Sequence, residues 1–205
     1  VIAHGDDDGI DTLDPVVTAE NLIVREWANP FEDAKGISLF GGSFTLRTSI
    51  VVDSAIGVQM KPGSGANSVL IDRSTLVDNP ISFNLKEPTA VPQSTVAIKS
   101  SIVRGTSASI TSNAGFSTFS VNYSNTVEPW VGGLGNSTAD PRFVDQVGRN
   151  YHLQPDSPGV DTGDPAASLA AGIGMVHQHF TLADNLSVLD NVMLGTEPLW
   201  RPWSR

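Results

Sequence analysis

The densest group of ionisable side chains in the sequence is the acidic opening, residues 4–11, which holds one histidine and four aspartates. Carboxylates held side by side can bind Ca²⁺, because this ion prefers hard oxygen ligands. The same closeness can raise the pKa of one carboxyl group, so that the pair acts as the acid and the nucleophile or base of a glycosidase. The acidic opening therefore predicts either a cation site or a catalytic site for carbohydrate.

The partners of these aspartates are expected 27 residues further on, where the sequence repeats. At that offset Asp6 lies beside Asp33. Asp8 lies beside Lys35, with neighbouring strands about 4.8 Å apart. We predict a Ca²⁺ site formed by Asp6, Asp7 and Asp33. The predicted catalytic residues, which would serve a polysaccharide lyase or glycoside hydrolase, are Asp7, Asp8, Asp11 and Lys35. Asp-Gly pairs also form ordinary turns, so a solvated turn is a third interpretation.

Further polar and aromatic side chains could contact a sugar. A polar column is predicted on the outer face of one set of strands, and its members are Asp11, Ser38, Gln59, Asn84 and Thr111. Any solvated strand face carries polar residues, so this column has an ordinary structural interpretation too. Trp27 and Trp130 could stack on sugar rings, but the alternative is that they cover loops.

The elements that must position these side chains follow from a repeat. Three sets of residues, most of them apolar, recur in the same order in each period, at spacings of 21 to 27 residues. The first set is Ile10, Ile37, Val58, Phe83 and Ile110. The second set is Ile23, Ile50, Thr75 and Ile102, with a weaker copy at Asn125. The third set is Ala19, Leu46, Ile71, Ile98 and Val121.

Short strands that recur in the same order are expected to stack on one another, with Gly, Pro, Asn and Asp supplying the turns between them. The β-branched residues then fill inward-facing columns, while their neighbours face water. An antiparallel sandwich would need tight hairpins and would not place the copies in register. We therefore predict an all-β fold over residues 1–164, a parallel β-helix of five to six coils.

The last part of this region carries a family resemblance. Residues 140–145 (DPRFVD) and 151–163 (YHLQPDSPGVDTG) resemble a terminal segment of pectin-lyase-like right-handed parallel β-helix proteins from bacterial surfaces and secretions. The resemblance implies a right-handed helix and a segment that packs across its last coil. The apolar cover is expected from Phe143, Val144, Tyr151, Leu153 and Val160. No comparable cap precedes the first coil, so we expect earlier coils or an end-to-end contact with another chain there.

Residues 165–205 do not continue the strand repeat, and a short strand and one helix are predicted there. Residues 171–203, with the run GIGMVHQHFTLADNLSVLDNVMLG, resemble the glutamine-loop region of ABC-transporter ATPases of the sugar and nucleoside importer type. The resemblance implies that Gln178 approaches the metal of a bound nucleotide. The chain has no G-x-x-x-x-G-K-[ST] loop to hold phosphates. We therefore expect an inert tail, joined as a fusion or packed against an end of the β-helix.

The composition of the chain excludes several kinds of partner and site. The chain has 12 Lys and Arg against 22 Asp and Glu, a formal net charge of −10, which argues against nucleic acid as a partner. It has no cysteine, so neither disulfides nor thiolate metal sites can form. No apolar run reaches the roughly 18 residues of a membrane span. The chain shows no signal peptide, and the pectin-lyase-like resemblance leads us to expect an extracellular or cell-surface location.

The predicted function is a β-helix scaffold that displays or binds carbohydrate without catalytic activity. The first alternative is a fragment of a polysaccharide lyase or glycoside hydrolase that uses the acidic opening. The second alternative is an ATP-binding fragment related to ABC transporters. Ca²⁺ is the one cofactor that the sequence predicts, and polysaccharide is the predicted ligand.

Overall fold

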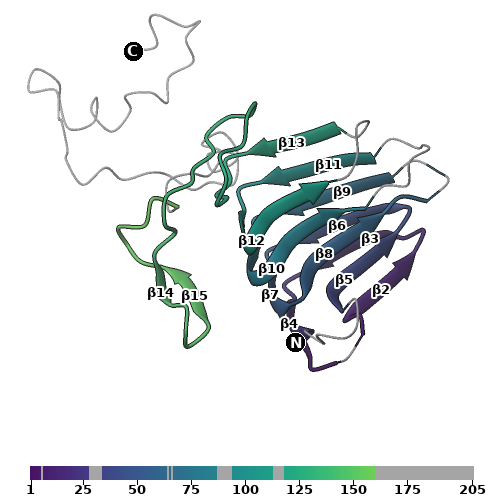
Figure 1. Cartoon of the computed structure of the whole chain (residues 1–205), viewed down its shortest axis with the longest axis horizontal. Helices are drawn as coiled ribbons and strands as arrows, with labels where there is room; N and C mark the ends of the chain where they lie inside the picture. The colour runs from purple at the N-terminus through teal and green to yellow at the C-terminus, as the bar shows by residue number, and fades with distance from the viewer. Residues whose placement is uncertain are drawn as a thin grey trace, which may run out of the picture. The chain divides into compact units, whose positions relative to one another are not determined.

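The computed structural model describes residues 1–5, 7–27, 34–63, 65, 67–86, 94–112 and 118–159. Within these residues the chain forms strands and no helix, which confirms the all-β prediction (Figure 1). Several predicted features lie outside the described residues, namely Asp6, Asp33, Val160, Gln178 and the tail of residues 165–205.

The larger sheet contains eight strands, and all of its pairs are parallel. One stack contains β1 (Ile2–Ala3), β4 (Ile23–Trp27), β7 (Ile50–Ser54) and the first halves of β10 (Thr75–Leu85) and β12 (Ile102–Ser112). The other contains β2 (Ile10–Leu13), β5 (Lys35–Phe40), β8 (Ile56–Lys61) and the second halves of β10 and β12. β10 and β12 thus pass through both stacks.

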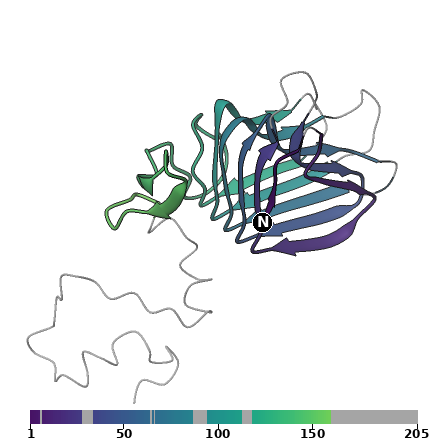
Figure 2. The same ribbon diagram turned by 90° about the horizontal axis from the view of Figure 1, so that it is seen from below.

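The smaller parallel sheet has five strands, one from each repeat period (Figure 2). They are β3 (Val16–Glu20), β6 (Ser43–Arg47), β9 (Asn67–Asp72), β11 (Ser94–Lys99) and β13 (Thr118–Asn122). A separate antiparallel pair, β14 (Phe143–Asp145) and β15 (Asn150–Leu153), forms the terminal hairpin, residues 143–153. The chain is therefore a parallel β-helix, or β-solenoid, followed by a hairpin.

The register between strands confirms the predicted repeat. In the first set Ile37 pairs with Ile10 on one side and with Val58 on the other. In the third set Leu46 pairs with Ala19 and with Ile71. The weak copy of the second set is also present, because Asn125 forms an isolated parallel bridge with Ile102.

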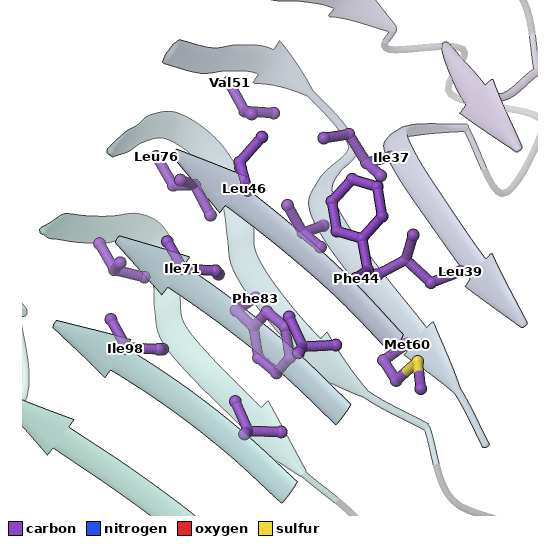
Figure 3. Packing of buried hydrophobic residues seen from close by; sticks show 14 of the residues in the cluster. Ile37, Leu39, Phe44, Leu46, Val51, Met60, Ile71, Leu76, Phe83 and Ile98 are labelled. Carbon is purple, nitrogen blue, oxygen red and sulfur yellow. The ribbon is translucent and has the colours of Figure 1, made fainter. Parts of the chain in front are cut away.

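Two facing sheets enclose one core. Ile37 and Leu39 of β5 point toward Phe44 of β6, with each of these side chains at most 2% exposed (Figure 3). Equivalent residues above and below continue the same columns. Burial of this kind contributes about 1.5–3 kcal/mol for each large apolar side chain, so the stacked interior supplies the main stabilisation of the fold.

A serine ladder, formed by Ser49, Ser74, Ser101 and Ser124, runs along the turns that join the smaller sheet to the larger one. Each hydroxyl accepts a hydrogen bond from the backbone amide of the previous coil, for example from Ser49 to Ser74 at 3.2 Å. Each also donates to the carbonyl two residues earlier, as Ser74 does to Asp72 at 3.0 Å. All four side chains are at most 3% exposed, so the ladder satisfies buried backbone groups that the tight turns leave unpaired.

The two ends of the solenoid differ. After β13, residues 123–139 cover one end: Trp130 packs on Phe119 with ring centroids 5.7 Å apart, and Asn136 accepts the last ladder bond from Ser124 at 3.0 Å. Trp130 thus packs against the core, whereas the sequence interpretation gave it a loop or a sugar ring to cover. At the other end β3 pairs with β6 alone, and Val17 of β3 remains 43% exposed.

Candidate binding cleft and its surroundings

The predicted catalytic pair Asp8 and Lys35 forms a buried ion pair. Lys35 is 3% exposed, and its Nζ lies 3.1 Å from Oδ1 of Asp8. The same oxygen accepts the backbone N–H of Lys35 at 3.0 Å. The predicted stacking of these two residues is therefore confirmed, and their contacts fix the start of β5 against the acidic opening.

The other described aspartates of the acidic opening differ from this pair because they are exposed. Asp7 is exposed in the loop before β2, and Asp11 is exposed on β2, in register with Ser38 as predicted. Across the described residues no group of three or more His, Cys, Asp or Glu side chains is placed to hold a metal ion. The calcium site that includes Asp6 and Asp33 stays a prediction, since both residues lie outside the described part.

The polar column is in register but is not solvated throughout. Thr111 donates to Asn84 at 2.9 Å, and Asn84 donates to Gln59 at 2.9 Å. Gln59 is 1% exposed and Ser38 is 5% exposed. The expectation of an outward column open to water is therefore wrong at its centre, because stacked polar side chains cover one another.

A feature absent from the sequence interpretation is an acidic ladder, formed by Glu26, Asp53 and Asp78. Each residue follows a paired position of the stack β4, β7 and β10, so the three carboxylates face the same flank. All three have left-handed backbones, with φ values of 66°, 53° and 56°. Non-glycine residues rarely adopt this conformation, and here it marks the bend between the two halves of the larger sheet.

The terminal hairpin lies against the acidic ladder and supplies its partners. Arg149 contacts Glu26 and reaches Oδ2 of Asp53 at 2.9 Å. Asp78 accepts hydrogen bonds from the Gln146 amide at 2.6 Å and from the Tyr151 hydroxyl at 2.9 Å. His4 contacts the other oxygen of Glu26 at 2.5 Å. These contacts neutralise carboxylates that would otherwise repel one another.

These contacts shift the pKa values of the groups involved. Burial works to raise the pKa of Glu26, but the hydrogen bond from Arg149 and the positive charges of Arg149, His4 and Arg25 outweigh it. The pKa of Glu26 is therefore lowered. Burial, the hydrogen bond to Asp78 and the negative charges of Asp78 and Asp53 raise the pKa of Tyr151 above its ordinary value, so Tyr151 remains a hydrogen-bond donor.

Apolar contacts seat the hairpin on the same flank. Phe143 is 8% exposed and packs against Val52 and Val77, together with Tyr151 and Leu153. The prediction that these three hairpin residues supply apolar cover is confirmed. The surface they cover belongs to the side of the stack rather than to its last coil, and Val144 is 50% exposed. The prediction for Val144 is wrong, because alternation along β14 turns it to solvent.

A cleft of about 180 Å³ lies between the flank and the hairpin. One wall consists of residues from three successive turns of the solenoid, including Arg73, Ser100 and Tyr123. These three residues share the left-handed conformation, with φ values of 47°, 48° and 50°. The other wall carries Tyr151 and Leu153 of β15. We call this the binding cleft.

The binding cleft combines groups suited to a small polar ligand. The side chain of Arg73 is 61% exposed, and one of its guanidinium nitrogens lies 3.4 Å from a carboxylate oxygen of Asp72. Two tyrosines offer flat apolar rings with polar ends, and Ser100 adds a hydroxyl. No group in it is a marked nucleophile or base, so the arrangement can bind and orient a ligand.

Sequence reasoning could have found the acidic ladder but not the cleft. Glu26, Asp53 and Asp78 each stand three positions after a member of the second repeated set, at spacings of 27 and 25 residues. An acidic residue that recurs at the spacing of the repeat can be recognised in the sequence. The cleft depends on where the hairpin docks, and no local pattern specifies that contact.

Comparisons with known proteins give partial matches of one kind. The chain is 38% identical over 84 residues to a putative carbohydrate transport ATP-binding protein of Mycoplasma pneumoniae, covering 37% of this chain and 14% of that protein. It is 41% identical over 49 residues to a putative ribose/galactose/methyl galactoside import ATP-binding protein of Burkholderia lata, covering 24% and 10%. It is 46% identical over 46 residues to the nucleoside import ATP-binding protein NupA of Lactococcus lactis, covering 22% and 9%.

These matches are to pieces of longer proteins, because the chain spans at most 14% of the length of the three relatives named. No family model matches the chain, and no solved structure matches it. None of the described segments is a helix with the length and apolarity needed to cross a membrane. The described residues form a β-solenoid. The chain has partial sequence similarity to ATP-binding proteins of sugar and nucleoside importers.

Proposed function

We propose that the chain is a β-solenoid scaffold that binds an acidic polysaccharide at the binding cleft without a catalytic step. The observation that carries the proposal is the combination of an exposed arginine with two tyrosine rings in one cleft. A guanidinium forms bidentate, charge-assisted hydrogen bonds with a carboxylate. An arginine that shares a cleft with aromatic rings therefore suits a sugar ring that carries a carboxylate, a uronic acid.

The size of the cleft sets the length of ligand it can hold. Its volume of about 180 Å³ equals roughly six water molecules at about 30 Å³ each. That space suits one sugar ring, with the rest of the ligand lying outside the cleft. The resemblance of residues 140–163 to pectin-lyase-like proteins supports a uronate and an extracellular or cell-surface location.

A scaffold role fits the state of the predicted catalytic residues. Lys35 would have to abstract a proton in a lyase, yet it is buried and bound to Asp8. Asp7 and Asp11 differ from that pair because both are exposed to solvent. The solenoid thus presents a rigid surface, and the cleft supplies its specificity.

The test is titration of the full chain with a galacturonic acid trisaccharide, followed by NMR or calorimetry. Binding should weaken at least about tenfold in Arg73→Gln, since a hydrogen bond to a charged group contributes about 1.5–3 kcal/mol. Arg142→Gln, which changes an exposed arginine outside the cleft, is the matched control and should bind normally. Equal binding of a neutral galactose trisaccharide, or full binding by Arg73→Gln, would refute the proposal.

The partial matches favour a second candidate, a nucleotide-linked role through residues 171–203. Its supporting observation is the similarity to import ATP-binding proteins of three organisms. Thermal unfolding with and without Mg-ATP separates the two candidates, because a ligand stabilises the state that binds it. An ATP-dependent rise in melting temperature that is lost in Gln178→Ala would favour the nucleotide role, and an unchanged melting temperature would dismiss it.

A further inference from the structure

The two walls of the binding cleft come from parts of the chain that are held in different ways. Arg73, Ser100 and Tyr123 belong to successive turns of the solenoid, where the serine ladder and the parallel strands fix their positions. Tyr151 and Leu153 belong to the terminal hairpin. Their wall exists only while the hairpin is docked, so the contacts that dock the hairpin also form the cleft.

Contacts outside the cleft hold the Tyr151 ring. The Tyr151 hydroxyl donates a hydrogen bond to Oδ2 of Asp78 at 2.9 Å, and the ring packs edge-on against Phe143 with centroids 5.4 Å apart. Asp78 also accepts a hydrogen bond from the Gln146 amide at 2.6 Å. Because Asp78, Gln146 and Phe143 lie outside the cleft lining, they act on a ligand through the position of Tyr151.

Arg149 makes a second attachment of the hairpin outside the cleft. Its guanidinium contacts Glu26 and lies 2.9 Å from Oδ2 of Asp53, while 41% of its side chain is exposed. Ion pairs with this much solvent contact contribute little singly. A two-stranded hairpin on its own is marginally stable in water. The docked state of this hairpin therefore depends on several modest contacts, and the loss of one or two of them should lower the docked fraction.

We propose that ligand binding at the binding cleft is coupled to docking of the terminal hairpin, with Asp78 and Arg149 as positioning residues. The inference rests on the proposed function, because it concerns the same ligand, an acidic polysaccharide. If only the docked hairpin presents the Tyr151 ring, the apparent dissociation constant rises as the docked fraction falls. By reciprocity a bound ligand must hold the hairpin against the flank.

Titration of the full chain with the galacturonic acid trisaccharide measures the first half of this coupling. Asp78→Ala should weaken binding by about 2- to 10-fold, the effect of losing one hydrogen bond, and the double variant with Arg149→Ala should weaken it further. Asp78→Asn keeps an acceptor for Tyr151 and Gln146, so it should bind nearly as the unsubstituted chain does. The matched control is Asp14→Ala, which removes an exposed carboxylate from another left-handed position, with φ of 42°.

Hydrogen exchange measures the other half. Saturating trisaccharide should raise the protection of the amides of residues 143–153, taken relative to the intrinsic exchange rate. The rise should be absent at the same concentration of a neutral galactose trisaccharide. A structural role of Asp78 and Arg149 confined to the hairpin would not make its protection depend on the ligand.

The outcomes separate this inference from the proposed function. Trisaccharide binding of equal strength in Asp78→Ala, Arg149→Ala and their double variant would overturn the coupling and leave the proposed function standing. Binding that leaves the protection of the hairpin unchanged would do the same. Full binding by Arg73→Gln, or no binding by the unsubstituted chain, would refute the proposed function and overturn the coupling with it.

Discussion

Replacement of Lys35 by methionine tests whether the buried pair with Asp8 is structural. At a separation of 3.1 Å the gross attraction is about 5 kcal/mol for an effective dielectric constant of about 20. Methionine removes the cost of burying an ammonium group but leaves the Asp8 carboxylate uncompensated. Removal of one partner of a buried pair costs about 3–5 kcal/mol. Asp8 retains some solvent contact, with 12% of its side chain exposed, so we expect a loss near the lower end of that range.

The double variant Asp8→Asn/Lys35→Met separates the attraction between the two charges from the other effects of the substitutions. Asparagine at position 8 can still accept a hydrogen bond from the backbone N–H of residue 35, as Asp8 does at 3.0 Å. The double variant should therefore recover about 2 kcal/mol relative to the sum of the single changes. Urea unfolding followed by tryptophan fluorescence measures these differences. Lys61→Met, at the half-buried end of β8, is the control and should change stability by less than about 0.5 kcal/mol.

Two results would refute this reasoning. A loss below about 1 kcal/mol for Lys35→Met would mean that the ion pair contributes no more than an exposed one. A double variant as unstable as the sum of its parts would mean that the two residues act independently. Either result would return Lys35 to consideration as the base of a lyase.

Three further predictions concern the solenoid and its hairpin. Ser74→Ala should destabilise the chain by about 1–3 kcal/mol, because it leaves a buried amide without its acceptor, whereas Ser43→Ala on the exposed face should have little effect in the same urea assay. Gly57→Ala should cost about 1–3 kcal/mol by calorimetry through overpacking, since a Cβ there would lie 2.6 Å from a backbone oxygen of the next coil. The pKa of Glu26 is lowered in the folded chain, so its contribution is present above the ordinary value of 4.5 and is lost as the pH falls through the folded value. The hydrogen-exchange protection of the hairpin amides, measured relative to the intrinsic exchange rate at each pH, should therefore fall at pH values below that range, and Arg149→Ala should lower it already at neutral pH.

Each of these predictions has a contrary outcome. Equal losses in Ser74→Ala and Ser43→Ala would show that the serine ladder adds no stability. An unchanged melting temperature in Gly57→Ala would show that the coils can separate to admit a methyl group. Protection of residues 143–153 that does not depend on pH, once corrected for the intrinsic exchange rate, would show that apolar contacts alone hold the hairpin.

The sequence predicted the stacked part of the fold down to register, because periodicity is a direct consequence of parallel stacking. Ile37 opposite Val58 and Leu46 opposite Ile71 are examples. The stacking of Asp8 on Lys35 followed from the same offset. Its chemical state did not follow, because an exposed acid–base pair and a buried ion pair share one pattern. Burial decides between them, and it depends on chain segments distant in sequence.

The hairpin shows the other limit of sequence interpretation. Its apolar residues Phe143, Tyr151 and Leu153 were recognised as cover, but the surface they cover was not. The outward residues Val52 and Val77 look like ordinary strand residues in the sequence. Only the tertiary contact distinguishes them from solvated positions, and the binding cleft is created by that same contact.

The attachment of the hairpin along the flank has a consequence for how the solenoid unfolds. In a stack where each coil touches only its neighbours, unfolding can proceed from a free end one coil at a time, as in a one-dimensional chain of units. Arg149 joins the coils of Glu26 and Asp53, and Tyr151 reaches the coil of Asp78. The hairpin thereby bonds to three successive coils and couples the first of them to the third, which it does not touch within the stack. The coils that they span should therefore come apart as one cooperative block, so that a pulling force applied at the β3 end meets a single high barrier instead of a series of small ones.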